Sequence, residues 1–349
     1  MHRRAELSGR TKDVLHLLIQ HYITSGEPVG SKTLSRQLPG KFSPATIRNT
    51  MAELEEAGYL THPHTSAGRV PSEKAFRFYV DGLPESEHVD RASARRIVRM
   101  LDGIDTPEEL MSRASFVLSD ISKSVGIVIA PPLATTQLKH IEFLDLGEGK
   151  ILVIFVSKSG LLQRKVIRLQ DRYPQSELDR AGRFLIERFS DRSLTEIRNE
   201  LLSMMEVERS MVDRMINLLR VWHESLEVEG DLAPETVFVQ GTLHMLDKPE
   251  FSDIGRMREL LQMFEEKSRL VKILNECIAS NSSEGVKVMI GSELGIPEMK
   301  EFTVITSSYP SQSNTLGFLG IIGPIRLEYG RTISAVSYLG KLVGQRINA

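Results

Sequence analysis

Apolar residues recur at helical spacing in three successive stretches near the N-terminus, and a strand-like pattern follows them. The spacing predicts helices over residues 11–24, 32–38 and 43–58. Ser31 would cap the second helix, and Pro39 with Gly40 would end it. Two short extended stretches around a turn then predict a hairpin over residues 59–71. Tandem helices followed by a hairpin are typical of a winged helix-turn-helix module.

The third stretch carries its own start and stop signals. Ser43 is a favourable N-cap, and Pro44 suits the first helical position, where its missing N–H costs nothing. Gly58 can take the left-handed conformation that ends a helix. One apolar stripe is formed by Ile47, Met51 and Leu54.

The outer face of this helix is small and polar only in its first half. Glu53, Glu55 and Glu56 crowd the second half, where phosphates would repel them, so residues 43–52 are predicted to enter a DNA major groove. The predicted base-contacting residues are Thr46, Arg48 and Asn49, with Ala45 or Ala52 available to a thymine methyl. An ordinary amphipathic surface helix is the alternative for this stretch alone, but the tandem helix and the hairpin favour DNA recognition.

Several polar residues around this helix are candidates for the DNA backbone. Those predicted to make phosphate or wing contacts are Lys32, Thr33, Lys41, Ser43, His64, Thr65 and Arg69. A metal pair made by His62 and His64 is a weaker alternative, because no cysteine or further histidine cluster lies nearby to complete four ligands. Ser72 would cap a further helix, and the aromatic residues of that helix are expected to pack against the module. The alternative is that these aromatic residues stack on DNA bases.

Charge and cysteine content add little to this pattern but agree with it. The formal net charge is -2, yet residues 1–80 hold 11 Lys and Arg against 7 Asp and Glu. Cys277 is the single cysteine, so no intrachain disulfide can form, which is typical of a reducing compartment. Residues 1–10 lack the hydrophobic region of a signal peptide, and no apolar run approaches the length of a membrane span. We therefore expect a soluble cytoplasmic protein, associated with the nucleoid when it binds DNA.

Beyond residue 80 the pattern alternates between helices and strands. An arginine-rich linker helix is predicted within residues 81–105, and the next helix is predicted to start at Thr106 and run to Lys123. Strands are predicted over residues 125–130, 138–146, 151–156, 161–169, 237–243, 286–290, 302–307 and 316–322. Further helices are predicted over residues 254–279 and 327–342. A nucleotide-binding role for Gly147, Gly149 and Lys150 fails, because no helix follows them to offer its N-terminus to phosphate.

A heptad-like apolar stripe occupies residues 194–222. Its members are Leu194, Ile197, Leu201, Met204, Met211, Met215, Leu218 and Trp222, with Glu208 interrupting the repeat. Such a stripe is usually intramolecular core. Additional apolar positions widen it, so a self-association surface is a second possibility.

Five motifs, taken together, resemble the HrcA family of heat-inducible transcription repressors. They lie at residues 28–34, 43–60, 64–71, 291–293 and 320–329, so the resemblance covers nearly the whole chain. It implies a dimeric repressor of chaperone operons that binds an inverted-repeat operator and depends on the GroE chaperonin for its active state. It also implies a GAF-like domain interrupted by an inserted dimerisation domain.

The expected fold class is therefore α+β and multidomain: an N-terminal winged helix-turn-helix, then a GAF-like α/β domain interrupted by a mainly helical insertion. The predicted ranges are 1–80 for the DNA-binding domain, 81–105 for the linker, 106–170 and 236–349 for the GAF-like domain, and 171–235 for the insertion.

Two other functions remain open from the sequence. A small-molecule-responsive regulator would keep the same DNA-binding module and use the GAF-like domain as a sensor. An enzyme with a DNA-binding regulatory module is disfavoured, because no catalytic motif stands out. No cofactor, metal or membrane partner is expected.

Overall fold

The computed structural model describes most of the chain in separate stretches. These are residues 7–37, 41–62, 68–84, 89–131, 136–169, 172–204, 237–246, 285–311 and 315–348, together with 248, 255, 258, 261, 262, 264 and 270. Two compact units divide the chain. The first combines Met1–Val89 with Val288–Ile305 and Ile322–Ser334, and the second contains the remainder.

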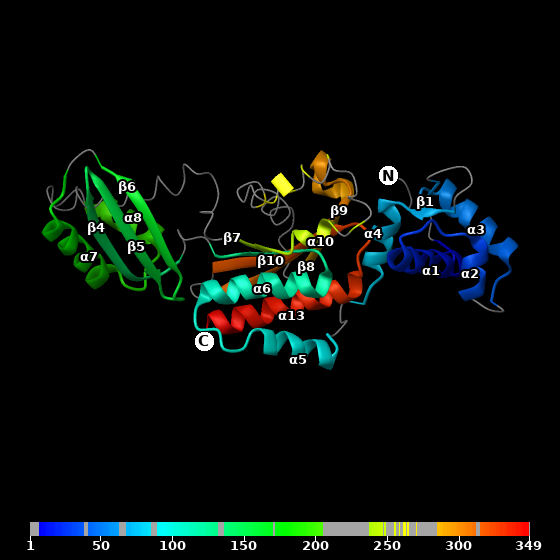
Figure 1. Cartoon of the computed structure of the whole chain (residues 1–349), viewed down its shortest axis with the longest axis horizontal. Coiled ribbons are helices and arrows are strands. Elements are labelled where there is room, and N and C mark those ends of the chain that lie inside the picture. The colour runs from blue at the N-terminus through cyan, green and yellow to red at the C-terminus, as the bar shows by residue number, and fades with distance from the viewer. Residues whose placement is uncertain are drawn as a thin grey trace. The chain divides into compact units, whose positions relative to one another are not determined.

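The N-terminal part of the first unit consists of three helices, a short hairpin and a fourth helix (Figure 1, dark blue to cyan). The elements are α1 (Gly9–Ser25), α2 (Ser31–Gln37), α3 (Pro44–Glu56), β1 (Leu60–Thr61), β2 (Val70–Pro71) and α4 (Glu73–Asp81). Ser43 caps α3 as expected, and Gly58 adopts a φ of 76° just beyond its end. β1 and β2 pair antiparallel, which confirms the hairpin. The segment predicted to end α2, residues 38–40, lies outside the described residues.

Buried apolar side chains lie on the helices of this module, which contact one another. The buried side chains include Val14, Leu15, Leu18, Ile19, Leu34, Ile47, Met51, Leu54, Phe76 and Tyr79. The predicted stripe of α3 is thus buried as expected. Phe76 and Tyr79 are also buried, which confirms that the aromatic residues of α4 pack on the module.

A five-stranded sheet follows in the order β7-β3-β10-β9-β8. Its strands are β3 (Val125–Ile129), β7 (Val237–Gln240), β8 (Val286–Ile290), β9 (Phe302–Ser311) and β10 (Thr315–Pro324). The linker helix is α5 (Arg91–Met100), and α6 (Pro107–Ser122) packs on β3 and β7 with Thr106 as its N-cap. Two short 3₁₀ helices, η4 (Gly291–Leu294) and η5 (Pro297–Met299), follow β8, and α13 (Tyr329–Ile347) closes the chain.

Several boundaries differ from the prediction, and the largest difference is that the closing helix ends at Ile347 and not at residue 342. The strand expected to reach residue 243 ends at Gln240, because Gly241 turns the backbone with a φ of 82° and Leu243–Leu246 form the short helix α10. The strand that starts at Phe302 runs to Ser311, and the closing helix begins two residues late, at Tyr329. The helix predicted over residues 254–279 lies almost entirely outside the described residues.

The segment between β3 and β7 forms a separate sheet. β3 and β7 are direct antiparallel neighbours, with Gly126 opposite Gln240 and Ile129 opposite Val237. Within the described part of the intervening chain, three strands form a sheet ordered β4-β5-β6: β4 (Leu138–Gly147), β5 (Lys150–Ser157) and β6 (Leu162–Arg168). Two helices accompany it, α7 (Gln175–Phe189) and α8 (Leu194–Met204) (Figure 1, green).

One hydrophobic core unites this sheet with both helices. It contains Ile141, Phe143, Ile151, Val153, Phe155, Ile167, Leu178, Leu185, Phe189, Leu194, Ile197 and Leu201. The core crosses residue 171, where the sequence predicts a domain boundary. Leu194, Ile197 and Leu201, the first members of the heptad-like stripe, are therefore intramolecular core. The side chain of Met204 and all of Met211, Met215, Leu218 and Trp222 lie outside the described residues.

Across the described residues, each helix is either too short or too polar to span a bilayer.

Candidate nucleic-acid interface

Four of the predicted base-contacting residues, Ala45, Arg48, Asn49 and Ala52, share one face of α3. Ala45, Arg48 and Asn49 are exposed, while Thr46 and Ala52 are partly covered. The opposite side of the helix is fixed by buried Ile47, Thr50, Met51 and Leu54. Because positions 45, 48, 49 and 52 follow helical spacing, their side chains point the same way, away from the module core.

The start of α3 holds two hydroxyl groups in place. Ser43 Oγ accepts a hydrogen bond from the Thr46 backbone N–H at 3.1 Å, and the two hydroxyls lie 2.9 Å apart. Thr50 Oγ1 donates to the Thr46 carbonyl at 3.1 Å. The first turn of α3 therefore presents an ordered, exposed helix N-terminus, which is a favourable place for a phosphate oxygen.

Two of the predicted phosphate contacts have different surroundings. Lys32 is exposed on α2. Lys41 forms a 2.7 Å ion pair with Asp13 of α1, and both side chains are about half exposed. Such a pair costs little to open in water, so Lys41 remains available to an anion.

Arg69 lies at the base of the hairpin and is held by several groups. Its Nη2 is 2.7 Å from Glu55 Oε2, and its Nη1 is 3.2 Å from His62 Nδ1. Its backbone exchanges two hydrogen bonds with Val29, at 2.8 and 2.9 Å. Among the described residues, the Arg69 Nε atom is buried without a hydrogen-bond partner. Nothing in the sequence pattern points to Glu55, because this pairing depends on the hairpin folding back onto the end of α3.

Gly68 makes the close approach of this strand possible. A Cβ at residue 68 would lie 2.5 Å from the carbonyl carbon and oxygen of Val29, closer than real Cβ contacts. His64 and Thr65, the other predicted wing residues, lie outside the described residues. Within the described ranges no group of three or more His, Cys, Asp and Glu side chains could hold a metal ion. His62 is instead 3.6 Å from Glu55.

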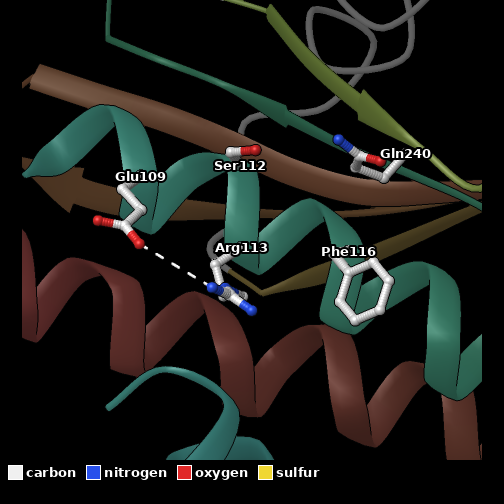
Figure 2. Close-up of a pocket in the computed structure, with 5 residues that line it drawn as sticks. All are labelled: Glu109, Ser112, Arg113, Phe116 and Gln240. Carbon is white, nitrogen blue, oxygen red and sulfur yellow. Dashed lines mark ion pairs between the residues drawn. The ribbon is translucent and has the colours of Figure 1, made fainter. Parts of the chain in front are cut away.

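The second unit has a surface hollow of about 250 Å³ (Figure 2). Four side chains of α6 and one of β7 line it: Glu109, Ser112, Arg113, Phe116 and Gln240. Glu109 and Arg113 form a 3.9 Å ion pair in which both side chains are about half exposed, and Phe116 is 46% exposed. Because both charges are solvated, the hollow provides no desolvated polar group to recognise a small ligand. It does not favour the sensor alternative.

These observations define a mixed α/β protein with an N-terminal helical module that exposes one face of its third helix. Comparison with known proteins places it further. The family model described as "HrcA protein C terminal domain" matches residues 108–333. The chain belongs to the HrcA family, as the sequence motifs indicate.

Its relatives match over almost their full length. The "Heat-inducible transcription repressor HrcA" of Geobacter sulfurreducens is 38% identical, covering 97% of this chain and 98% of the relative. The protein of the same name from Syntrophobacter fumaroxidans is 36% identical, covering 98% and 97%. A crystal structure titled only as a hypothetical protein at 2.2 Å resolution aligns with a TM-score of 0.62 at 20% identity, covering 98% of this chain and 99% of that one. This last likeness concerns the fold alone.

Proposed function

We propose that this protein is a heat-inducible transcription repressor that reads an inverted-repeat operator with a winged helix-turn-helix module. The observation that carries the proposal is the exposed face of α3, where Ala45, Arg48 and Asn49 project from a helix whose other side is buried. Membership of a family whose relatives are named transcription repressors places the chain among regulators and not among enzymes.

In this proposal the N-terminal half of α3 enters the major groove. Arg48 would bind guanine in a bidentate manner, Asn49 would bind adenine, and Ala45 or Ala52 would contact a thymine methyl. Lys32, Thr33, Lys41, Ser43 and Arg69 would contact phosphates, which fixes the register of the helix in the groove. The glutamates at the far end of α3 stay outside the groove.

Footprinting on the DNA upstream of the protein's own gene would identify the operator. Arg48→Ala should then cost about 1–3 kcal/mol of operator binding and relax sequence preference at one base pair. Arg36→Ala is a matched control, because it removes an exposed arginine from α2, outside the proposed contacts. Unchanged affinity and unchanged sequence preference in Arg48→Ala would overturn the assignment of α3.

We also propose that the inserted domain spans the segment between β3 and β7 and carries the homodimer interface of this repressor. Support comes from the adjacency of β3 and β7 and from the separate core of the β4-β5-β6 sheet. The GAF-like domain would then comprise the parts of the chain before and after that segment.

The face of the β4-β5-β6 sheet opposite its core is the candidate surface for a second copy. Leu144, Leu152 and Val166 pair across the three strands, and Val166 is 52% exposed. In the next row, Glu142 pairs with Ile154 and Ile154 pairs with Arg164. Paired residues point to the same face of a sheet, so Ile154 at the centre of this face has Glu142 on the β4 side and Arg164 on the β6 side.

This arrangement is complementary to itself. A two-fold axis parallel to β5 exchanges the two edges, so Glu142 of one copy would face Arg164 of the other and Ile154 would meet its own counterpart. A dimer of this kind would present two α3 helices to the two halves of an inverted repeat. Interface roles for Met204, Met211, Met215, Leu218 and Trp222 remain a sequence-based prediction.

The family resemblance further supports control of chaperone operons and dependence on the GroE chaperonin. We propose that chaperonin keeps the repressor competent and that heat diverts it to other substrates. Operator binding measured after heating and cooling should recover more fully with GroE than without it. Equal recovery in both samples would contradict this dependence.

A further inference from the structure

Two motifs near the C-terminal end of the sequence contact the N-terminal helices. Residues 291–293 belong to η4, and residues 320–329 include Arg326 and Tyr329. All the contacts described below lie inside the first compact unit. They have no part in the DNA contacts proposed above, although the motifs are among those that mark the family resemblance.

The first set of contacts joins α4 to η4. Arg77 Nε donates to Glu293 Oε1 at 2.7 Å, and Arg77 Nη2 donates to Glu293 Oε2 and to the Val288 carbonyl, the latter at 2.7 Å. One helical turn earlier, Glu73 Oε2 accepts from the Ser292 backbone N–H at 3.0 Å and from the Ser292 hydroxyl at 2.5 Å. Glu73 and Arg77, one helical turn apart on α4, thus form hydrogen bonds with two consecutive residues of η4, Ser292 and Glu293.

The second set joins α1 and α4 to the segment that precedes and begins α13. Arg326 Nη1 donates to the Ile23 carbonyl, at the end of α1, at 3.1 Å. The ring of Tyr329 lies 6.1 Å from that of Phe76 and 6.4 Å from that of Tyr79. Tyr329 Oη is itself placed by the Ile325 carbonyl and by Thr303 Oγ1, at 2.7 and 2.9 Å.

Two glycines make room for the charged groups. Gly291 has a φ of 56°, and a Cβ there would lie 2.4 Å from the Glu73 carboxyl. Gly26 has a φ of 73°, and a Cβ there would lie 3.1 Å from the Arg326 guanidinium carbon. Each glycine therefore permits both a left-handed turn and the approach of a side chain from a distant part of the sequence.

We propose that Glu73, Arg77, Ser292, Glu293 and Arg326 form a latch that holds the DNA-binding module in one orientation on residues 288–305 and 322–334 of the same compact unit. This inference rests on the proposed function. The fixed orientation of the two modules determines the distance between half-sites at which the dimer binds an operator. These residues are positioning residues, since none of them lies on the exposed face of α3.

The chemistry of the contacts suits this role. Bidentate pairing of arginine with carboxylate fixes angle as well as distance, and lysine cannot reproduce it. Arg77 and Glu293 are 27% and 36% exposed, so the pair is accessible enough to open without unfolding the module core. When one module of the dimer has bound its half-site, the second module binds without a further loss of freedom only if it already lies over the other half-site. Rigidly held modules meet this condition at one distance between the half-sites, whereas loosely held modules meet it at several distances.

The variants Arg77→Ala and Glu73→Ala each remove side-chain hydrogen bonds between α4 and η4. Arg77→Lys keeps the positive charge but loses the bidentate pairing with Glu293. Asp81→Asn is the matched control, because Asp81 pairs with the same arginine at 3.4 Å but lies on α4 itself. Each full-length protein is titrated against three DNAs. They carry a single half-site, the footprinted inverted repeat, and that repeat with five base pairs inserted, about half a helical turn.

We expect the wild-type protein and Asp81→Asn to lose affinity sharply on the inserted DNA. Arg77→Ala and Glu73→Ala should keep their single half-site affinity, bind the native repeat about 10-fold more weakly, and lose little more on the inserted DNA. Arg77→Lys should fall between these two behaviours. A wild-type spacing profile in Arg77→Ala and Glu73→Ala would overturn the latch.

A measurement without DNA separates the latch from the proposed function. Spin labels at Arg36→Cys and Lys300→Cys, in a chain with Cys277→Ala, report the distance between α2 and the segment after η5. The distance distribution should be narrow in the Asp81→Asn background and clearly broader in the Arg77→Ala background. Equal widths would overturn the latch even if DNA binding is confirmed, while absent DNA binding with a broadened distribution would overturn only the proposed function.

Discussion

Arg48 and Arg69 carry the same charge in different surroundings. Arg48 projects from the exposed face of α3, while Arg69 is 22% exposed and paired with Glu55. A phosphate contact by Arg69 would have to compete with that carboxylate. The immediate neighbours of each arginine therefore determine how freely its guanidinium could make the DNA contact proposed for it.

Glu55→Gln tests this competition. Neutralising Glu55 frees the Arg69 guanidinium and removes a negative charge near the phosphates, so operator binding should strengthen by about 0.2–1 kcal/mol. The dependence of binding on salt should also become steeper. Titrations at several salt concentrations measure both effects.

Glu56→Gln is the control, because it removes an equal charge from the same helical turn at an exposed position. If the two variants behave alike, the gain reflects overall charge and Arg69 makes no phosphate contact.

His16 provides a prediction about pH. Its ring lies 5.8 Å from Phe78 and 5.3 Å from Tyr79. Burial lowers the pKa of His16 below its usual value of 6.5, and the charge of Asp13 only partly opposes this effect. The folded module therefore binds this proton less readily than the unfolded chain.

Its contribution to stability should be fully present above pH 6.5 and should be lost as the pH falls from 6.5 through the lower, folded-state pKa. Melting temperatures measured between pH 5 and 8 should show this loss in the wild type and much less of it in His16→Phe. Identical pH profiles would mean that His16 does not couple protonation to folding.

Among the elements, those with local start and stop signals could be predicted and those defined by long-range packing could not. Thr106, with Pro107 at the first position of α6, announces that helix in the sequence, as Ser43 does for α3. The grouping of α7 and α8 with β4-β5-β6 depends on a shared core that no local pattern displays. Likewise, Arg77 and Glu293 are 216 residues apart in the sequence, so no local pattern predicts their contact.

The β4–β5 turn places a residue with a Cβ in a left-handed backbone conformation, which is unfavourable for it. Gly147, Glu148 and Gly149 all adopt positive φ, at 82°, 53° and 73°. A left-handed residue with a Cβ costs roughly 1–2 kcal/mol, and asparagine tolerates this conformation better than most residues. The Glu148 side chain is 81% exposed and pairs only with Lys150 among the described contacts, at 3.3 Å.

Glu148→Asn should therefore raise the free energy of unfolding by up to about 1 kcal/mol, and Glu148→Val should lower it. Both variants lose the ion pair with Lys150, so their difference isolates the backbone effect. Chemical denaturation of the two proteins measures it, and equal stabilities would show that the turn relaxes at no cost.

At the scale of the whole molecule, the sequence predicts the family and the mixed α/β character, but it does not predict which distant segments of the chain pair with each other. The motifs that mark the family are short and local, and the match over residues 108–333 agrees with them. By contrast, the pairing of β3 with β7 across the inserted segment is a contact between distant parts of the sequence. Burial of Leu194, Ile197 and Leu201 also moves the proposed dimer contact from α8 to the open face of the sheet.

The charges on that face give the sharpest test of the proposed dimer. In the two-fold arrangement, Glu142→Arg places an arginine opposite Arg164 of the second copy, and Arg164→Glu places a glutamate opposite Glu142. Each single reversal should weaken dimerisation at least about tenfold, or about 1.4 kcal/mol, because like charges then face each other at both symmetric positions. Combining the two reversals restores opposite charges and should restore the dimer, as analytical ultracentrifugation would show.

Arg183→Glu serves as the control for this pair, because it reverses an exposed arginine on α7, a helix that packs against the core of the same sheet. Its dimerisation should match that of the wild type. Recovery in the double variant cannot come from altered net charge, since the double variant has the same net charge as the wild type. If the single reversals leave the dimer intact, or the double reversal fails to restore it, the sheet face is not the interface. The heptad-like stripe beyond Met204 would then be the surface to mutate next.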